Sequence, residues 1–414
     1  MKFLHLADLH LGKALHGISL LESGDQPNFV DGLLGLCAEV RPDAVLVAGD
    51  VYDRGAPAAG AVELLSRLLT GLTDQGVSVL LIPGNHDSAQ RLAFGRALLA
   101  RAGLHIAPPL APPGELSRVT LTDEHGPVDF WLLPYLFPAL AGEALGTELR
   151  DYDAAVRAVL AAQPLDPTRR NVLLAHQNVT EGGVEGERGG SESMVGGVGQ
   201  VDFTAFDGFD YVALGHIHAG YAVGRPGVRY AGSPLCYHFH ETKQAAKGPL
   251  LVELGPKGTA PRTTLLPLEP LHRLRAAAGT YEALRAALAD GDSAPQGGGD
   301  YFSLTLTDRR VTPALAEDLR GLVEARGGLL MELTSDYRPE GTAGLRSAAA
   351  LREQGLAELF ADFRAQRSGG EAPDGAELAI LQKAEELAQT ADLRLPPDEN
   401  QIEQLLRLAM GVKA

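Results

Sequence analysis

Five short segments of the chain carry side chains that can bind metal ions. They offer carboxylate, imidazole and amide groups, which are the ligands that borderline and hard divalent cations accept. The segments are Asp8-Leu9-His10, Gly49-Asp50-Val51-Tyr52-Asp53, Gly84-Asn85-His86-Asp87, His176 and Gly215-His216-Ile217-His218. Two cations held close together could clamp the attacking and leaving oxygens of a phosphoryl displacement. That chemistry needs a carboxylate shared by both cations, and Asp50 is our candidate for it.

Each segment alone is a weak signal. An Asp-x-His pair arises by chance in a chain of this length. A lone His10 or His176 is more often a core or surface histidine, Gly-Asn-His-Asp can be a simple turn, and Gly-His-x-His can belong to an edge strand. The set is informative because every segment directly follows a predicted strand. Ligand sites gather at the carboxyl ends of the strands in open α/β sheets.

The elements that must position these segments follow from the apolar pattern. Short apolar strands alternate with longer helices, which is typical of a layered α/β fold. We predict strands at residues 3–7, 44–48 and 77–82, with helices at 29–40, 58–72 and 91–102 between or after them. Further strands are predicted at 130–133, 172–175, 211–214, 228–231 and 250–254, with a surface loop rich in Gly and Glu at 180–199. A helix at 281–289, a strand at 301–307, a helix at 314–325 and a strand at 329–334 form a small α+β unit.

Composition narrows the class of protein. The chain has 414 residues, 45% of them hydrophobic, and a formal net charge of -17, which argues against a protein that binds polyanions through a basic surface. The negative net charge does not exclude an enzyme that binds phosphates through metal ions, because each divalent cation adds two positive charges. Two cysteines, Cys37 and Cys236, are too few for a disulfide framework or a structural zinc site. With no apolar run long enough to span a bilayer and no signal-peptide pattern, we expect a soluble, cytoplasmic protein.

In their order and types, the five segments resemble the motifs of the calcineurin-like metallophosphoesterases. Within that superfamily the chain is most similar to bacterial nuclease subunits that process DNA ends. Residues 5–13, Asp25-Gln26 and Gly232-Ser233-Pro234 also fit, so the resemblance by motif covers about the first 240 residues. It implies an α/β sandwich of two β-sheets flanked by helices, with a small α+β capping domain and a helical C-terminal tail. The expected domains are residues 1–270 for the phosphoesterase, 271–340 for the cap and 341–414 for the tail.

The resemblance also implies a role for each site residue. One metal would be held by Asp8, His10, Asp50 and His218, and the second by Asp50, Asn85, His176 and His216. Mn²⁺ is the implied ion, and a water activated by the two metals would attack phosphorus in line. His86 would be the general acid, a suitable role for a side chain that titrates near neutrality. Asp53 would orient His86 or support a ligand, with a loop-capping acid as the alternative.

The implied function is that of a dimetal DNA nuclease in repair and recombination. Its activities would be a 3'-5' exonuclease on double strands and an endonuclease on single strands and hairpins. The implied partners are DNA, an ATPase with a long coiled coil, and a second copy of the chain within a heterotetramer. The chain has no Gly-x-x-x-x-Gly-Lys-Ser/Thr motif of its own, so ATP dependence would come from the partner. Apolar helical stripes after Gly341 would bind that ATPase, or would pack on the chain's own body.

Three other functions fit parts of the pattern. A phosphoprotein phosphatase shares the segment around Asp50, although Asp87 stands where those enzymes usually have Glu. A nucleotide phosphodiesterase is the second enzymatic alternative, and the substrate, monoester or DNA diester, separates these enzymes from a nuclease. A non-catalytic adaptor that kept the fold is the third, and it predicts missing ligands, whereas none is missing. His238 and His240 lie near the motifs, but the resemblance gives them no role.

Overall fold

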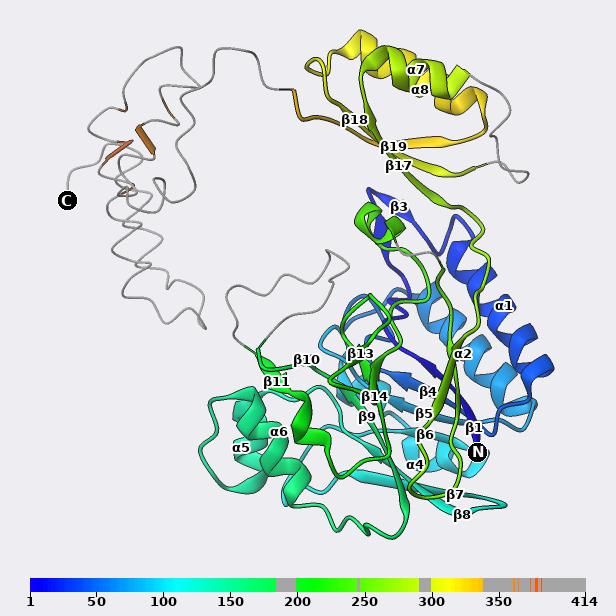
Figure 1. The fold of residues 1–414 in the computed structure, drawn as a ribbon, viewed down its shortest axis with the longest axis vertical. Coiled ribbons are helices and arrows are strands. Elements are labelled where there is room, and N and C mark those ends of the chain that lie inside the picture. Colours follow the sequence, from blue (N-terminus) through cyan, green and yellow to red (C-terminus); the bar gives the residue numbers. More distant parts are fainter. Residues whose placement is uncertain are drawn as a thin grey trace. The chain divides into compact units, whose positions relative to one another are not determined.

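The computed structural model describes residues 1–183, 199–243, 246–289 and 299–337, together with a few single positions between 360 and 381 (Figure 1). The elements described below all belong to one compact unit, Met1–Tyr337. The predicted tail helices at 341–414 and most of the predicted loop at 180–199 lie outside the described residues. Within the described part of the chain, no helix is both long and apolar enough to cross a membrane.

The first of two large sheets carries three of the predicted site segments. Its central strands are almost wholly apolar and buried, which suits parallel strands covered on both faces. In spatial order the sheet consists of β16 (Arg262–Leu265), β15 (Leu250–Glu253), β1 (Lys2–Leu6), β4 (Ala44–Ala48), β5 (Ser78–Ile82) and β6 (Leu104–Ile106). Strands β1, β4, β5 and β6 are parallel, so their carboxyl ends meet at one edge.

The second large sheet carries the remaining two segments. In spatial order it consists of β13 (Ala222–Val223), β14 (Arg225–Tyr230), β12 (Tyr211–Gly215), β9 (Arg170–His176), β8 (Gly126–Leu132) and β7 (Ser117–Asp123). Its central strands β12 and β9 run parallel with Gly215 beside His176. The predicted strands of both sheets are therefore present, while β7, whose residues alternate between half-buried and exposed, was not predicted.

The two sheets pack face to face. Phe3, Leu46 and Leu80 from the first sheet share a buried cluster with Phe130 and Tyr211 from the second. This packing confirms the predicted sandwich, and it fixes the carboxyl ends of β1 and β4 against those of β9 and β12. Residues more than 160 positions apart in the chain can therefore form one site.

Helices cover the outer face of each sheet (Figure 1). The first sheet is covered by α1 (Asp25–Val40) and α2 (Ala59–Asp74), and the second by α5 (Pro138–Leu145) and α6 (Tyr152–Ala161), which were not predicted. The helix predicted at 91–102 is wrong as a single element. It is divided into α3 (Ala89–Leu92), α4 (Arg96–Leu99) and a turn of 3-10 helix at Ala100–Ala102. The break falls at Gly95, whose φ of +71° lies in the left-handed region that favours glycine.

Smaller elements connect these layers. Two short ladders pair β2 (Ala14–Leu15) with β3 (Ile18–Ser19), and β10 (Asn178–Thr180) with β11 (Gln200–Asp202). Two 3-10 helices, η2 (Phe203–Phe206) and η3 (Phe239–Lys243), follow β11 and β14. The second of these, η3, packs against the strand that begins the small C-terminal unit.

That small unit, here called the cap, is a three-stranded sheet with two helices on it (Figure 1). It consists of β17 (Leu274–Gly279), α7 (Tyr281–Ala289), β18 (Tyr301–Leu306), α8 (Pro313–Ala325) and β19 (Leu329–Ser335). All three strands are parallel, so each helix is a crossover connection. The sequence analysis did not predict β17, whose Leu-Arg-Ala-Ala-Ala-Gly sequence lacks the β-branched residues typical of strands.

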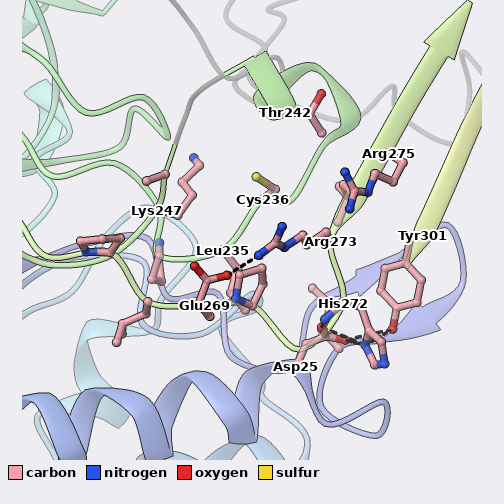
Figure 2. A pocket seen from close by; sticks show the side chains of 17 residues that line it. Asp25, Leu235, Cys236, Thr242, Lys247, Glu269, His272, Arg273, Arg275 and Tyr301 are labelled. Atoms are coloured by element: carbon pink, nitrogen blue, oxygen red, sulfur yellow. Dashed lines mark hydrogen bonds and ion pairs between the residues drawn. The ribbon is translucent and has the colours of Figure 1, made fainter. Parts of the chain in front are cut away.

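A buried carboxylate joins the cap to the large sheets. Asp25, at the start of α1, lies at the edge of a cavity of about 420 Å³ (Figure 2). Its side chain accepts hydrogen bonds from Tyr301 Oη at 2.9 Å and His272 Nδ1 at 3.0 Å. Ser23 Oγ donates to the same carboxylate at 2.6 Å. These three contacts are made by Oδ2, and Oδ1 accepts a hydrogen bond from the backbone nitrogen of His272 at 3.3 Å, so the cluster fixes the segment that leads into the cap.

We expect Asp25→Asn to loosen that connection. The amide would turn an N–H₂ group toward hydrogen-bond donors, and hydrogen bonds to charged groups contribute about 1.5–3 kcal/mol each. Hydrogen exchange of β17 and β18 should therefore become faster, with a lower free energy of unfolding. Asp31→Asn, at an exposed position of α1 that pairs only with Arg67 among the described residues, is the matched control. Equal exchange of the cap in both variants would contradict the assignment.

Candidate metal centre

All of the predicted metal ligands lie together at the carboxyl ends of the two sheets. The first sheet contributes loops after three strands, and the second contributes the end of one strand and the loop after another. The residues are Asp8 and His10 after β1, Asp50 after β4, Asn85 after β5, His176 at the end of β9, and His216 and His218 after β12. The structure therefore brings the five sequence segments into one site.

One half of the site is built on Asp8, His10 and His218. Their ligand atoms lie within 4.8 Å of one another, and all three side chains are buried. The Nε2 atoms of His10 and His218 are 3.2 Å apart, and His10 Nε2 is 3.6 Å from Asp50 Oδ2. Two imidazole nitrogens and two carboxylates thus face one small volume, which is the arrangement that a cation needs.

The other half is built on Asp50 and His176. His176 Nε2 is 3.4 Å from Asp50 Oδ2 and 3.1 Å from the Asn85 side-chain oxygen. The same Asn85 oxygen is 3.1 Å from His216 Nδ1. Asp50 therefore faces both halves, as expected for a shared carboxylate.

The loops that hold these ligands adopt strained backbone conformations. Among the described residues, only six that are not glycine have a positive φ, and four of them are predicted ligands: Asp8, His10, Asp50 and His216. Non-glycine residues adopt this region rarely and at an energetic cost, and such residues cluster at functional sites. Asp8, Asp50 and His216 lie within two residues of the ends of β1, β4 and β12, so these left-handed turns occur where the chain leaves the two sheets.

Polar side chains that are not ligands fasten the loops to one another. The Asp87 carboxylate accepts hydrogen bonds from the backbone N–H groups of Val51, Tyr52 and Gly84, at 2.9–3.0 Å. Gln26 donates to the backbone oxygen of His10 at 2.8 Å. The sequence analysis noted Asp87 and Gln26 as parts of motifs, and the structure assigns them the task of fixing the loops after β4, β5 and β1.

Burial and mutual charge shift the pKa values of the site. Burial raises the pKa of Asp8 to about 6, against the opposing charge of His176. Burial alone would lower the pKa of His176, but Asp50 and Asp8 raise it to about 9. Burial lowers the pKa of His216 to about 3, so its imidazole is neutral. Positive charge is therefore favoured between the carboxylates, and a bound cation would displace the proton of His176.

His86 lies at the open side of the site. Its side chain is 42% exposed, and its Nε2 is 3.9 Å from Asp50 Oδ2. Its Nδ1 is 3.0 Å from the backbone oxygen of Asp53, and not from the Asp53 carboxylate. That carboxylate instead accepts a hydrogen bond from Lys13 Nζ at 2.9 Å and lies 3.6 Å from His10 Nδ1. The backbone of Asp53 is therefore placed to orient His86, whereas its carboxylate is bound by Lys13 and lies beyond hydrogen-bonding distance of His10 Nδ1.

The sequence analysis missed a residue behind His218. The Glu241 carboxylate, on η3, is 3.2 Å from His218 Nδ1. Tyr237 packs its ring edge-on against both His10 and His218 and donates its hydroxyl to the backbone oxygen of Leu9 at 2.5 Å. No spacing rule marks a glutamate 23 positions after a histidine, so the only available signal was its nearness to Gly232-Ser233-Pro234.

The donor set fits divalent cations on structural grounds. Buried carboxylates need a compensating positive charge, and Asp8 and Asp50 offer oxygen atoms within 4.8 Å of each other and of His176. The imidazoles of His10 and His218 direct ring nitrogens at each other, which a bound cation between them would explain. Histidine, carboxylate and amide ligands suit Mn²⁺, Fe²⁺, Zn²⁺ or Mg²⁺ rather than a soft ion.

Family models match two parts of the chain. Residues 1–220 match the family described as calcineurin-like phosphoesterase, and residues 267–368 match the one described as type 5 capsule protein repressor C-terminal domain. The first match covers all of the predicted ligands, because His218 is the last of them. The second begins just before β17 and includes the whole cap.

Known proteins are similar to the chain over most of its length. The D subunit of the nuclease SbcCD from Staphylococcus saprophyticus is 33% identical over 300 residues, which are 68% of this chain and 73% of that protein. The protein of the same name from Staphylococcus epidermidis is 31% identical over 291 residues, with the same coverage of both chains. A crystal structure of TT1561 of Thermus thermophilus matches at a TM-score of 0.39 and 12% identity, over 64% of this chain and 98% of that one.

The chain therefore belongs to the calcineurin-like phosphoesterase family and, within it, to the group formed by the D subunits of SbcCD nucleases. Membership implies divalent metal ions at the site described above.

We expect Gly84→Ala to disrupt the centre without altering any ligand. A Cβ at this position would collide with both the carboxylate and the backbone nitrogen of Asp50. Asp50 would have to move, and because it faces both halves of the site, calorimetry should show that both metals bind more weakly. The effect should approach that of Asp50→Asn.

Gly35→Ala is the matched control for this substitution. Gly35 lies in α1, where a Cβ meets nothing within 4 Å, and alanine favours a helix over glycine by about 1 kcal/mol. This variant should keep wild-type metal binding. Wild-type binding by Gly84→Ala would show that Asp50 does not need its observed position.

Proposed function

We propose that this protein is a metal-dependent DNA nuclease that hydrolyses phosphodiester bonds. The observation that carries the proposal is the position of Asp50, which faces two sets of ligands while His86 stands exposed beside it. Two divalent cations, when bound, would activate a water and neutralise charge on the phosphate. The 33% identity to the D subunit of an SbcCD nuclease supports DNA as the substrate.

The ligands divide between the two cations according to the two halves of the site. We assign Asp8, His10, Asp50 and His218 to one ion, and Asp50, Asn85, His176 and His216 to the other. The ligand atoms of Asp8, His10 and His218 form one group, while Asp50 groups with His176 and Asp8 on one side and with His10 and His86 on the other, which supports a carboxylate shared between the two ions. We propose Mn²⁺ as the ion of both sites.

His86 is the residue we assign to proton transfer. It is the exposed imidazole of the site, so a phosphate bound over the metals would meet its ring first. Its Nδ1 donates to the backbone oxygen of Asp53, which leaves Nε2 facing the centre. When the ring is an imidazolium, Nε2 also carries a proton and can give it to the oxygen that leaves phosphorus, so that the leaving strand departs as a neutral hydroxyl and His86 is left neutral.

The partners we propose are those of the SbcCD complex. An ATPase of the SbcC type would open or deliver DNA. The ATP hydrolysis would come from that partner, because this chain has no Gly-x-x-x-x-Gly-Lys-Ser/Thr motif of its own. We place its contact in residues 341–414, for which the sequence predicts helices and into which the family match extends as far as residue 368. The cap would help to hold DNA over the centre. Bound metals would supply positive charge at the site of a chain whose net charge is -17.

The reactions we propose are exonuclease action from 3' to 5' on double strands and endonuclease action on single strands and hairpins. Their place would be DNA repair and recombination in the cytoplasm. A phosphoprotein phosphatase or nucleotide phosphodiesterase has the same chemistry at phosphorus, and the choice of substrate distinguishes them.

A second copy of the chain is the further partner we propose. Phe94, Leu98 and Val62 are large apolar side chains with exposed fractions of 85%, 69% and 45%. Val62 and Phe94 line the rim of a groove of about 810 Å³ whose other walls are mainly apolar residues of α2, β5 and β6, and Leu98 is the neighbour of Leu99, which also lines it. One face therefore carries both protruding apolar groups and a hollow to receive them. A two-fold axis would place the side chains of each copy in the groove of the other.

His86→Gln tests the proposed function. The substitution removes a proton donor but no ligand, so cleavage of linear duplex DNA with Mn²⁺ should fall by about 10²- to 10⁴-fold while both metals still bind. His125→Gln, at a surface turn, is the matched control and should cleave like the wild type. A phosphomonoester is tested in parallel.

The outcomes of that experiment separate the candidate functions. Wild-type cleavage by His86→Gln would contradict the role of His86. Turnover of the monoester with intact DNA would favour the phosphatase. If the wild type cleaves neither substrate, the assay is repeated with the ATPase partner and ATP, and failure there would contradict the nuclease.

Leu98→Asp tests the proposed dimer. A charge on the apolar face should prevent a second copy from packing there, and sedimentation should then show a monomer where the wild type is a dimer. Leu140→Asp, at another exposed apolar position, on α5, should remain a dimer. A monomeric wild type, or a dimeric Leu98→Asp variant, would contradict this surface.

A further inference from the structure

The Glu241 carboxylate lies at the centre of a buried hydrogen-bond network behind His218. Its Oε1 is 3.2 Å from His218 Nδ1 and 3.3 Å from the backbone nitrogen of Tyr237. Its Oε2 is 2.8 Å from Lys247 Nζ and accepts a hydrogen bond from Ser233 Oγ at 3.1 Å. The Glu241 side chain is completely buried, and both of its oxygens are occupied. It can therefore adopt only this orientation.

Lys247 binds the oxygen of Glu241 that does not contact His218. An ammonium group has three N–H donors, and here all three have acceptors. They bond Glu241 Oε2, Ser233 Oγ at 2.9 Å and the backbone oxygen of His218 at 2.7 Å. Figure 2 shows Lys247 beside the cavity that also contains Asp25. The same lysine thus fixes both the carboxylate and the main chain of the histidine that this carboxylate contacts.

The network determines which nitrogen of His218 carries a proton. The two oxygens of Glu241 accept hydrogen bonds from the Lys247 ammonium and from the backbone N–H of Tyr237, which are groups that can only donate. A carboxylate held by these donors offers only acceptor sites to His218, so Nδ1 of His218 donates. Its Nε2 is then a bare lone pair, and it faces His10 Nε2 at 3.2 Å.

The two halves of the centre differ in how their histidines are oriented. His176 Nδ1 donates to the backbone oxygen of Ala48 at 2.8 Å, so the main chain of β4 fixes that ring. His218 depends on the side chain of Glu241 instead. A substitution can therefore disturb the orientation of one histidine and leave the other unchanged.

We propose that Glu241, held by Lys247, is a positioning residue for one of the two metal ions. It fixes His218 with Nε2 toward the ion that Asp8, His10 and His218 hold, and it has no equivalent function toward the other ion. This inference rests on the proposed function for the presence of two ions. Carboxylates that orient metal-binding histidines typically change metal affinity by about 10–100-fold when they are replaced.

Metal binding by the full chain is the first test. Binding of Mn²⁺ is measured by calorimetry in the absence of substrate. Glu241→Gln keeps the shape of the side chain but removes its charge. One equivalent should bind about 10–100-fold more weakly, and the other should bind as in the wild type. Asp129→Asn, at another buried carboxylate that pairs with an arginine, is the matched control and should bind both equivalents normally.

The tautomer of His218 in the metal-free wild type is the second test, and it does not depend on metal binding. Nitrogen NMR of histidine-labelled protein should show the proton on Nδ1. A proton on Nε2 would overturn the inference even if two metals bind. Wild-type affinity for both equivalents in Glu241→Gln would also overturn it, as would an equal loss of both.

A wild type that binds fewer than two ions, with His218 protonated on Nδ1, would contradict the proposed function and leave the positioning of His218 supported. The two failures can therefore be distinguished.

Discussion

Two buried carboxylates, Asp8 and Asp50, impose the constraint on which the site depends. Each would lose several kcal/mol of hydration free energy without compensation, and they lie close enough to repel one another. In the metal-free protein the protonated His176 offsets part of that repulsion. A pair of divalent cations would offset it more fully. The arrangement is stable only because a rigid surrounding structure holds the two carboxylates together.

The two sheets provide that rigidity. Asp8 and Asp50 leave neighbouring parallel strands of one sheet, and the backbone nitrogen of Asp8 donates to the oxygen of Gly49. The backbone nitrogen of His216, from the other sheet, donates to the Asp8 carboxylate at 3.0 Å. The sandwich therefore does more than support the ligands, because the second sheet supplies a hydrogen bond to a carboxylate of the first. Behind this layer, Asp87, Gln26 and Glu241 hold the loops and one histidine ring in fixed orientations.

Much of this architecture was predictable from the sequence. Strands such as β4 and β12 are short apolar runs followed at once by polar residues, and this pattern identifies both the strand and the ligand after it. Elements whose signal depends on tertiary contacts were missed. The strand β17 is rich in alanine, β7 alternates on a half-exposed edge, and the helix predicted at 91–102 is broken at Gly95, where Phe94 remains exposed.

At the site, the predictable part was the set of residues that could bind metal. The supporting contacts could not be predicted, because they depend on which atoms the fold brings together. The Asp53 side chain contacts Lys13, and only its backbone contacts His86. Glu241 contacts His218 from a 3-10 helix that no sequence period marks.

The central claim is that Asp50 is shared by two metal ions at the junction of the two sheets. Anomalous diffraction at the manganese edge, from crystals of the full chain grown with Mn²⁺, tests it most directly. The account predicts two peaks about 3.5–4 Å apart, both in contact with the Asp50 carboxylate. A single peak, or two peaks of which only one touches Asp50, would contradict it.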